Sequence, residues 1–214
     1  MAEKSVNAVS RATIQRLPMY LNCLKVKLQA NIKNISARVI ADELKFNEVQ
    51  VRKDFASVSS FGGRPKTGYK TEVLIADIEK FLGYNNKKKA VLVGVGQLGS
   101  ALLSYKGFEE YGLNIVAGFD VNPKVIASKN QKNIFPLSEI EMFCKHIDVK
   151  IGIITVPSNN AQEVCDILVQ SGILAIWNFA PLHLKVPENI LVHNENMAVS
   201  LAFLSKHLEE NLTE

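Results

Sequence analysis

The stretch Ala90-Val91-Leu92-Val93-Gly94-Val95-Gly96-Gln97-Leu98-Gly99 decides the fold of this chain. Four apolar residues lead directly into the pattern Gly-x-Gly-x-x-Gly, which is typical of a buried parallel strand, a tight turn and a helix. Gly94 allows the turn, Gly96 lets the backbone approach a pyrophosphate, and Gly99 lets the helix pack close to the strand. The N–H groups at the start of that helix favour phosphate. The pattern therefore predicts a dinucleotide site.

A second apolar segment, residues 114–121, supports this interpretation. It reads as a strand that carries Asp120 near its end, about 20 residues beyond the glycines, where an acid accepts hydrogen bonds from a ribose. An acid at this place favours NAD over NADP because it repels a 2′-phosphate, although the nearby Lys124 weakens that preference. A glycine turn that packs but binds nothing is the alternative.

The remainder of the C-terminal part alternates strand and helix, which predicts a doubly wound parallel sheet. We expect helices over 98–111, 137–144 and 158–171, the last capped by Ser158, and strands over 134–135, 149–156, 173–179 and 190–192. In such sheets the ligand lies at the carboxyl ends of the strands. The expected NAD(H) site comprises Gly94, Val95, Gly96, Gln97, Leu98, Gly99, Tyr105, Asp120, Val121, Lys124, Thr155, Val156, Pro157, Asn178 and Phe179.

The nicotinamide end of the cofactor is expected near Tyr105, Pro157 and Phe179. A neutral, reduced ring fits such apolar and aromatic surroundings better than a cationic, oxidised ring, because desolvating a charge is costly. The site is therefore expected to distinguish NADH from NAD+.

The N-terminal third has a different character. Leu17, Leu21, Leu24 and Leu28 form a helical stripe, with Pro18 expected near the start of its helix. Ser36 is a candidate N-cap for a second short helix. Asn47 and Gln50 form a capping-box pattern for a third helix over 48–58, and 71–82 reads as a linker helix.

Short helices with an exposed polar and basic face, followed by a basic loop at 59–69, are typical of a recognition helix and a wing. Arg64 and Lys66 could contact phosphates or a narrow minor groove. The expected DNA-contacting residues are Ser36, Gln50, Arg52, Lys53, Ser57, Arg64, Lys66 and Tyr69. A small helical cap with a solvated charged face is the alternative.

Composition sets limits on the function classes. The chain of 214 residues is 47% hydrophobic, carries a net charge of +4, and has no apolar run long enough to span a membrane. Its three scattered cysteines suggest a reducing cytoplasm, and its four isolated histidines show no metal-ligand spacing. We therefore expect a cytoplasmic protein with neither membrane nor metal among its partners.

We expect three parts: a winged-helix DNA-binding domain at 1–84, a Rossmann NAD(H)-binding domain at 85–194, and a C-terminal helix at 195–214. The C-terminal helix carries apolar residues on more than one side, so it must be buried on more than one side. Packing on its own domain is one explanation, and insertion into a second copy to make a homodimer is the other.

Several motifs in order give the chain a resemblance to a known family. These are 14–20 (IQRLPMY), 51–55 (VRKDF), 94–102 (GVGQLGSAL), 105–108 (YKGF), 119–123 (FDVNP), 155–157 (TVP), 178–181 (NFAP) and 186–188 (VPE). Over nearly its whole length the chain resembles the redox-sensing transcriptional repressors of the Rex family. The resemblance implies a winged-helix domain fused to a Rossmann domain. It also implies a homodimer with exchanged C-terminal helices, which binds an inverted-repeat operator and is released by NADH.

The sequence departs from the family pattern at three places. Proline stands at position 65, where the wing of the family has a glycine, and Gln97 stands where some members carry a basic residue. Asn196 stands where most carry an aspartate. The resemblance implies that this aspartate joins Arg16 and Tyr105 in a switch network, so we expect a muted NADH response. The alternative is that Asn196 only caps the terminal helix.

Two other function classes remain. The first is an enzyme, either an NAD-dependent dehydrogenase or a CoA-binding ligase subunit. No acid or base follows a strand near the expected nicotinamide position, and His183 is a weak catalytic candidate. The second is a DNA-binding protein whose Rossmann domain serves only dimerisation.

Overall fold

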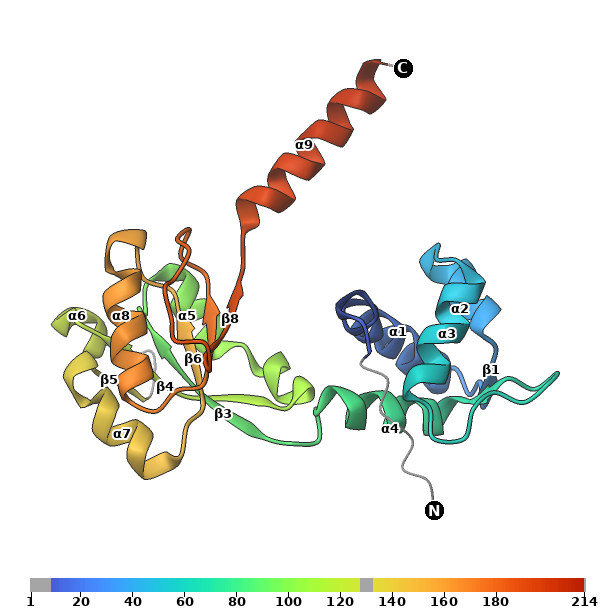
Figure 1. The fold of residues 1–214 in the computed structure, drawn as a ribbon, viewed down its shortest axis with the longest axis horizontal. Coiled ribbons are helices and arrows are strands. Elements are labelled where there is room, and N and C mark those ends of the chain that lie inside the picture. Colours follow the sequence, from blue (N-terminus) through green and yellow to red (C-terminus); the bar gives the residue numbers. More distant parts are fainter. Residues whose placement is uncertain (1–8, 128–132, 214) are drawn as a thin grey trace. The chain divides into compact units, whose positions relative to one another are not determined.

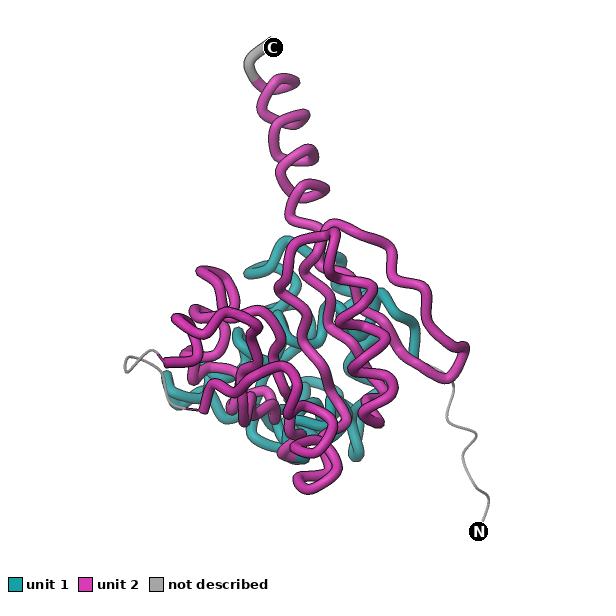
Figure 2. Tube along the Cα trace, turned by 90° about the vertical axis from the view of Figure 1, so that its left-hand side faces the viewer, with its two compact units in different colours: residues 1–86 teal, residues 87–214 magenta. Residues whose placement is uncertain are grey.

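The computed structural model describes residues 9–127 and 133–213. Residues 1–8 of the expected winged-helix domain and residue 214 of the expected C-terminal helix therefore lie outside the described residues. The chain divides into two compact units, residues 1–86 and 87–214 (Figure 2). The division falls two residues after the expected end of the first domain at 84, and it groups the C-terminal helix with the second unit. Each unit is described by itself.

The first unit is helical with one small antiparallel ribbon. Its elements are α1 (Arg11–Gln29), β1 (Asn34–Ile35), α2 (Ala37–Leu44), α3 (Glu48–Val58), β2 (Tyr69–Lys70) and α4 (Thr71–Leu82). Its core holds Leu17, Tyr20, Phe55 and Ile78, all fully buried. The rings of Tyr20 and Phe55 meet edge to face with centroids 5.4 Å apart. This core fixes α1 and α3 against each other.

Two local expectations for this unit are wrong in detail. Pro18 lies inside α1 and not near its start, so the helix continues through a residue that lacks an N–H. Asn47 does cap α3 by accepting from the N–H groups of Val49 and Gln50. The side chain of Gln50 does not complete a capping box, because it donates to Asp54 at 3.0 Å.

The second unit is a six-stranded parallel sheet in the order β5-β4-β3-β6-β7-β8 (Figure 1). The strands are β3 (Lys88–Val93), β4 (Leu113–Asp120), β5 (Ile134–Pro136), β6 (Ile151–Ile154), β7 (Ala175–Asn178) and β8 (Leu191–Asn194). The helices are α5 (Gln97–Ser104), η1 (Lys106–Tyr111), α6 (Pro123–Ile126), η2 (Leu137–Glu139), α7 (Ile140–Ile147), α8 (Ser158–Gln170) and α9 (Met197–Thr213). This is the expected doubly wound fold, with the glycine turn after a central strand.

Alternation along β3 explains why helices cover both faces of the sheet. Val91 and Val93 pack in the core that α7 and α8 cover, whereas Ala90 and Leu92 pack in the core on the side of α5 and α6. Because both faces are buried, the strand reads as a continuous apolar run.

Three boundaries in this unit differ from expectation. The helix expected over 98–111 is divided at Tyr105, whose backbone is extended, into α5 and the 3-10 helix η1. The helix expected to begin at 137 opens with the 3-10 turn η2 and continues as α7 to Ile147. Ser158 is the first residue of α8 and not its cap, because Pro157 holds the cap position without a side-chain bond.

The terminal helix α9 does not pack on its own domain within the chain. Its described side chains from Met197 to Asn211 are all exposed. Leu201, Phe203 and Leu204 have exposed fractions between 63% and 66%. Of the two explanations offered by the sequence, burial against the same chain is therefore wrong, and α9 presents apolar side chains that need another partner.

Candidate functional site

The three glycines of the first turn have separable roles. Gly94 has a φ of +96°, and a Cβ there would lie 2.7 Å from Cγ1 of Val156. A Cβ on Gly99 would lie 2.0 Å from the carbonyl oxygen of Gly94. A Cβ on Gly96 would meet nothing within 4 Å. The fold therefore requires Gly94 and Gly99, while Gly96 leaves open space beside the loop.

Polar side chains brace this loop from two neighbouring strands. The hydroxyl of Thr155 donates to the carbonyl oxygen of Gly94 at 2.7 Å. The carboxylate of Asp120 accepts from the N–H of Val95 at 2.7 Å and from the N–H of Asn122 at 2.8 Å. A carboxylate has about four acceptor positions, so Asp120 can hold the loop and still accept from a ribose hydroxyl.

A cavity of about 270 Å³ opens at the carboxyl ends of β3, β4 and β6. Its lining residues are Val93, Gly94, Gly96, Asp120, Val121, Leu137, Thr155, Val156, Pro157, Asn160, Glu163 and Val164. A more open hollow of about 540 Å³ shares Asp120, Val121 and Leu137 with it. The expected site omitted five of these residues, Val93, Leu137, Asn160, Glu163 and Val164, because a strand or helix pattern does not indicate which of its residues face a ligand.

The other residues expected in the cofactor site do not line this cavity. They are Val95, Gln97, Leu98, Gly99, Tyr105, Lys124, Asn178 and Phe179. The side chain of Asn178 is fully buried. It donates to the carbonyl oxygens of Ala180 and Leu182 and to Oδ1 of Asn194, and it accepts from the N–H of Ala180. We therefore expect Asn178 to shape the loop after β7 and not to contact a cofactor with its side chain.

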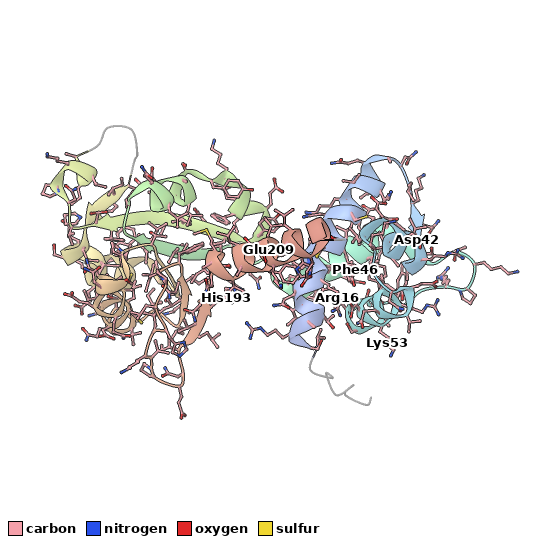
Figure 3. The ribbon with its side chains drawn as sticks, turned by 90° about the horizontal axis from the view of Figure 1, so that it is seen from above. Arg16, Asp42, Phe46, Lys53, His193 and Glu209 are labelled. Carbon is pink, nitrogen blue, oxygen red and sulfur yellow. The ribbon has the colours of Figure 1, made fainter. Side chains whose placement is uncertain are left out.

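The recognition helix expected from the sequence is α3. Lys53 lies exposed on its surface (Figure 3). Arg52 is exposed and forms an ion pair with Glu48 one turn earlier. Ser36 is exposed and accepts from the N–H of Val39 at the start of α2. The hydroxyl of Ser57 donates to the backbone of Asp54, so it is less free to contact DNA than the two basic side chains.

Asp54 is a buried charged residue of α3 that sequence reasoning did not single out. It is 2% exposed, and its carboxylate accepts from Nε and Nη2 of Arg16 at 2.8 and 3.0 Å. Further donors are the hydroxyl of Tyr20 at 2.9 Å, the hydroxyl of Thr13 at 3.1 Å and the amide of Gln50 at 3.0 Å. One carboxylate thus fixes α3 to α1.

The titration of this cluster follows from its geometry. Burial raises the pKa of Asp54, but the hydrogen bonds from Arg16, Tyr20, Gln50 and Thr13 outweigh burial and lower it below the usual range. The bond to Asp54 raises the pKa of Arg16, and burial raises the pKa of Tyr20 to about 12. The pair is therefore ionised at neutral pH.

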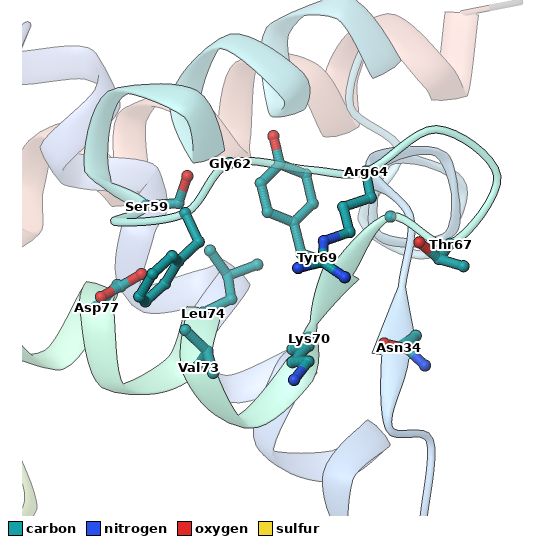
Figure 4. Close-up of a pocket in the computed structure, with 12 residues that line it drawn as sticks. Asn34, Ser59, Gly62, Arg64, Thr67, Tyr69, Lys70, Val73, Leu74 and Asp77 are labelled. Carbon is teal, nitrogen blue, oxygen red and sulfur yellow. The ribbon is translucent and has the colours of Figure 1, made fainter.

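The wing is a tight hairpin. Backbone hydrogen bonds of 2.8 and 2.9 Å join Arg64 and Gly68, and Lys66 at the tip has a φ of +67°. Arg64 lines two hollows, one of about 470 Å³ that also includes Arg52 and Lys66, and one of about 420 Å³ next to α4. Figure 4 shows the second, with Arg64 and Lys70 on one side and Asp77 on the other. Arg64 can thus be reached from both sides of the wing.

Tyr69 differs from its expected role as a DNA contact. The residue is 8% exposed, and its ring packs edge to face on Phe55 with centroids 5.3 Å apart. A Cβ on Gly63 would lie 2.8 Å from this ring, so glycine is needed for the wing to lie over it. Tyr69 is mainly a core residue that supports the wing.

Residues 9–127 and 133–213 contain no cluster of histidine, cysteine and acidic side chains that could hold a metal ion. In the same part of the chain, no helix has the length and apolarity required to cross a bilayer.

Comparisons with known proteins identify both units. A family model described as "CoA binding domain" matches residues 85–182, and one described as "Putative DNA-binding protein N-terminus" matches residues 8–56. The chain is 40% identical over 205 residues to a redox-sensing transcriptional repressor Rex of Treponema denticola, covering 95% of this chain and 96% of that protein. It is 36% identical to a Rex repressor of Clostridium acetobutylicum, covering 94% of each. The chain belongs to the Rex family.

Solved structures of RSP, which is described as a Rex-family repressor, agree with the fold. A crystal structure described as RSP in complex with β-NAD+ and operator DNA matches with a TM-score of 0.87 and 34% identity, covering 97% of this chain and 95% of that one. A structure described as RSP in complex with β-NADH matches with a TM-score of 0.85 and 35% identity, covering 97% of each. The winged-helix and Rossmann architecture expected from the sequence is confirmed.

The three residues of the expected Rex switch have partners of their own in this structure. Arg16 is bound to Asp54 as described, and Tyr105 is 56% exposed beside Phe108. Oδ1 of Asn196 accepts from the N–H groups of Ala198 and Val199 at 3.1 and 3.3 Å, so Asn196 caps α9. A network among Arg16, Tyr105 and Asn196 stays a prediction.

Proposed function

We propose that this Rex family member is a transcriptional repressor that binds an inverted-repeat operator and releases it when NADH binds. The main support is the similarity of nearly the whole chain to redox-sensing repressors of the Rex family. Solved structures of similar proteins are described in complex with NAD+ and operator DNA and in complex with NADH. In this chain α3 and the wing supply the DNA surface, and the glycine loop supplies the cofactor site.

The residues of the second unit fit a dinucleotide. Gly94 and Gly96 line the cavity, and the open space at Gly96 leaves the backbone accessible to a pyrophosphate. The N–H groups at the start of α5 would bind the phosphates, and Asp120 would bind the ribose. Asp120 also favours NAD(H) over NADP(H) by repelling a 2′-phosphate.

The redox signal would enter through the nicotinamide and not through thiols. The chain has three cysteines, Cys23, Cys144 and Cys165, and all are buried. Burial raises the pKa of each thiol, to about 11 for Cys165, which keeps the unreactive protonated form. A neutral NADH ring, by contrast, loses less hydration than a cationic NAD+ ring on entering an apolar site.

The exposed apolar residues of α9 support a homodimer as part of this proposal. The apolar side chains of the helix are exposed on several sides in the single chain, and a second copy offers the same helix and the same sheet in return. Exchange between two copies would bury both helices in a symmetric, self-complementary interface. Two copies would also present two recognition helices to an inverted repeat.

We also infer that the protein is a regulator without catalytic activity. His183, the catalytic candidate of the sequence, is exposed and does not line the 270 Å³ cavity. A repressor acts where the chromosome lies, which agrees with the cytoplasmic location that the cysteine pattern suggests.

The test is a binding titration on a labelled inverted-repeat DNA selected with the protein itself. NADH should release the DNA from the wild type, and NAD+ at equal concentration should not. Gly96→Val should fold normally, because a side chain at Gly96 meets nothing within 4 Å, yet it should bind neither cofactor form. It should therefore keep DNA binding and lose the NADH effect.

Two results would contradict the proposal. Equal release by NADH and NAD+ would remove the redox response, and unchanged release in Gly96→Val would place the cofactor elsewhere. Consumption of NADH by the purified protein with common 2-oxo or aldehyde substrates would favour the oxidoreductase alternative.

A further inference from the structure

A row of four aromatic rings lies on one face of the sheet in the second unit. The ring centroids of Tyr105 and Phe108 are 5.0 Å apart, those of Phe108 and Trp177 are 5.6 Å apart, and those of Trp177 and Phe179 are 4.9 Å apart. Neighbouring rings therefore touch. The row begins and ends at two residues expected at the nicotinamide end of the cofactor, Tyr105 and Phe179.

A glycine holds the first ring in place. A Cβ on Gly107 would lie 2.4 Å from Cζ and 2.5 Å from the hydroxyl of Tyr105. The ring of Tyr105 thus lies over the backbone of Gly107, where another residue would displace it. This close approach accounts for the interruption between α5 and η1.

The indole of Trp177 connects the row to the start of α9. Its Nε1 donates to Oε1 of Glu195 at 3.0 Å. Glu195 follows β8 directly, its N–H donates to the carbonyl oxygen of Asn178 at 2.8 Å, and it precedes the α9 cap Asn196. The same carboxylate oxygen lies 3.2 Å from Nε2 of His193.

We propose that Trp177 is a positioning residue that transmits occupation of the nicotinamide end to α9 through Glu195. The proposal rests on the function proposed above. Packed rings occupy discrete arrangements and compress little, so a nicotinamide that moves Tyr105 or Phe179 also moves the indole. Movement of the indole changes its bond to Glu195, and with it the direction in which α9 leaves the sheet.

Four variants separate the parts of this connection. Trp177→Phe keeps an aromatic ring and removes the N–H donor. Glu195→Leu removes the acceptor, whereas Glu195→Gln keeps an acceptor oxygen and removes the charge. His193→Gln removes the imidazole that lies beside Glu195 and leaves the indole bond intact. For each full-length protein, NADH affinity is measured by calorimetry, operator release by fluorescence anisotropy, and assembly by sedimentation.

The ratio of the NADH concentration for half release to the NADH dissociation constant is the deciding quantity. We expect it to rise about tenfold, equivalent to about 1.4 kcal/mol, in Trp177→Phe and Glu195→Leu. His193→Gln should stay within about twofold of the wild type, because the indole bond persists. Glu195→Gln should raise the ratio less than Glu195→Leu does, because a neutral hydrogen bond replaces a charge-assisted one. A purely structural role would lower assembly or NADH affinity and leave this ratio unchanged.

Three results would overturn the proposal. The first is an unchanged ratio in both Trp177→Phe and Glu195→Leu. The second is an effect of His193→Gln as large as that of Glu195→Leu, which would assign the coupling to the contact between His193 and Glu195. The third needs no variant: Trp177 is the sole tryptophan, so an emission maximum that NADH does not shift in the wild type excludes movement of the indole. Failure of NADH to release operator from the wild type would instead refute the proposed function, and this inference with it.

Discussion

At the scale of single residues, Asp54 determines how the recognition helix is held. Asp54→Ala would leave the guanidinium of Arg16, whose side chain is 20% exposed, without its bidentate partner. Removing one partner of a buried ion pair costs about 3–5 kcal/mol, so we expect a loss of stability in that range. Urea unfolding followed by circular dichroism measures it. Asp42→Ala removes an exposed carboxylate of the same unit and should cost under about 0.5 kcal/mol.

The same carboxylate predicts an acid dependence. Its pKa is lowered in the folded protein, because hydrogen bonds from Arg16 and its neighbours outweigh burial, which raises it. The ionised carboxylate therefore stabilises the fold at any pH above about 4, the pKa of an aspartate in the unfolded chain. This contribution is lost as the pH falls from there through the lower pKa of the folded state. The first unit should therefore lose stability below about pH 4. Asp54→Asn should be less stable at neutral pH and lack this part of the acid slope; an unchanged slope would assign it to other groups.

Sequence reasoning could not find this cluster, for a physical reason. The partners of Asp54 in α1 are 34 to 41 residues away, and only tertiary packing brings them together. The signals that did succeed are local. Asn47 marks the start of α3 because its side chain accepts from the N–H groups of Val49 and Gln50. The glycines mark the cofactor loop because the turn requires Gly94 and Gly99.

The limits of the helices show the same difference: those set by local residues could be predicted, and those set by packing could not. The limits of α3 and α4 are those expected, because a cap begins the first and Gly83, at a φ of +73°, ends the second. The helix expected over 98–111 is divided, because Tyr105 folds over Gly107 and leaves the helical conformation. The periodicity of apolar residues does not reveal that the Tyr105 side chain packs over Gly107.

The wing gives a prediction about DNA affinity. Lys66 occupies the left-handed region, so Lys66→Gly keeps the turn while it removes the charged side chain. We expect weaker operator binding and a salt slope smaller by about 1, the loss of one phosphate contact. Lys45→Gly makes the same chemical change at a second lysine with positive φ, and should leave both quantities nearly unchanged. Equal effects of the two variants would mean that the wing tip does not contact DNA.

The terminal helix gives a prediction about assembly. Leu204 is one of the exposed apolar residues of α9 and is 65% exposed in the single chain. Leu204→Asp would place a charge in the proposed dimer interface, where an unpaired buried charge is costly. Sedimentation should show conversion of dimer to monomer, and operator affinity should fall because two half-sites are no longer bound together. Lys206→Ala, on the same helix, should remain dimeric. A dimer that survives Leu204→Asp would remove α9 from the interface.

At the scale of the whole molecule, the chain joins a DNA-binding unit and a cofactor unit, and the sequence predicted both. The parallel sheet requires a strand, a glycine turn, a helix and a second strand that ends in an acid, in this order along the chain. The Rossmann unit could therefore be predicted from the sequence alone. The apolar surface of α9 pointed to a partner. How much NADH changes operator affinity is set by differences between two states of the assembled protein, which neither unit determines alone.

Asn196 predicts a muted response to NADH. Resemblance implies an aspartate here, which would hold Arg16 and Tyr105 in one of the two states. Charge-assisted hydrogen bonds contribute about 1.5–3 kcal/mol and neutral ones about 1 kcal/mol, so an asparagine distinguishes the two states less. A difference of about 1.4 kcal/mol would reduce the NADH-driven change in operator affinity about tenfold.

Asn196→Asp is a clean test of that reduction, because aspartate caps a helix as well as asparagine and α9 keeps its cap. NADH titration of the operator complex should show a larger change in affinity for this variant than for the wild type. Asn194→Asp adds the same charge two residues earlier, where the side chain can still accept from Asn178, and should not enlarge the change. If the wild type already leaves DNA fully at low NADH and Asn196→Asp changes nothing, Asn196 acts only as the cap of α9.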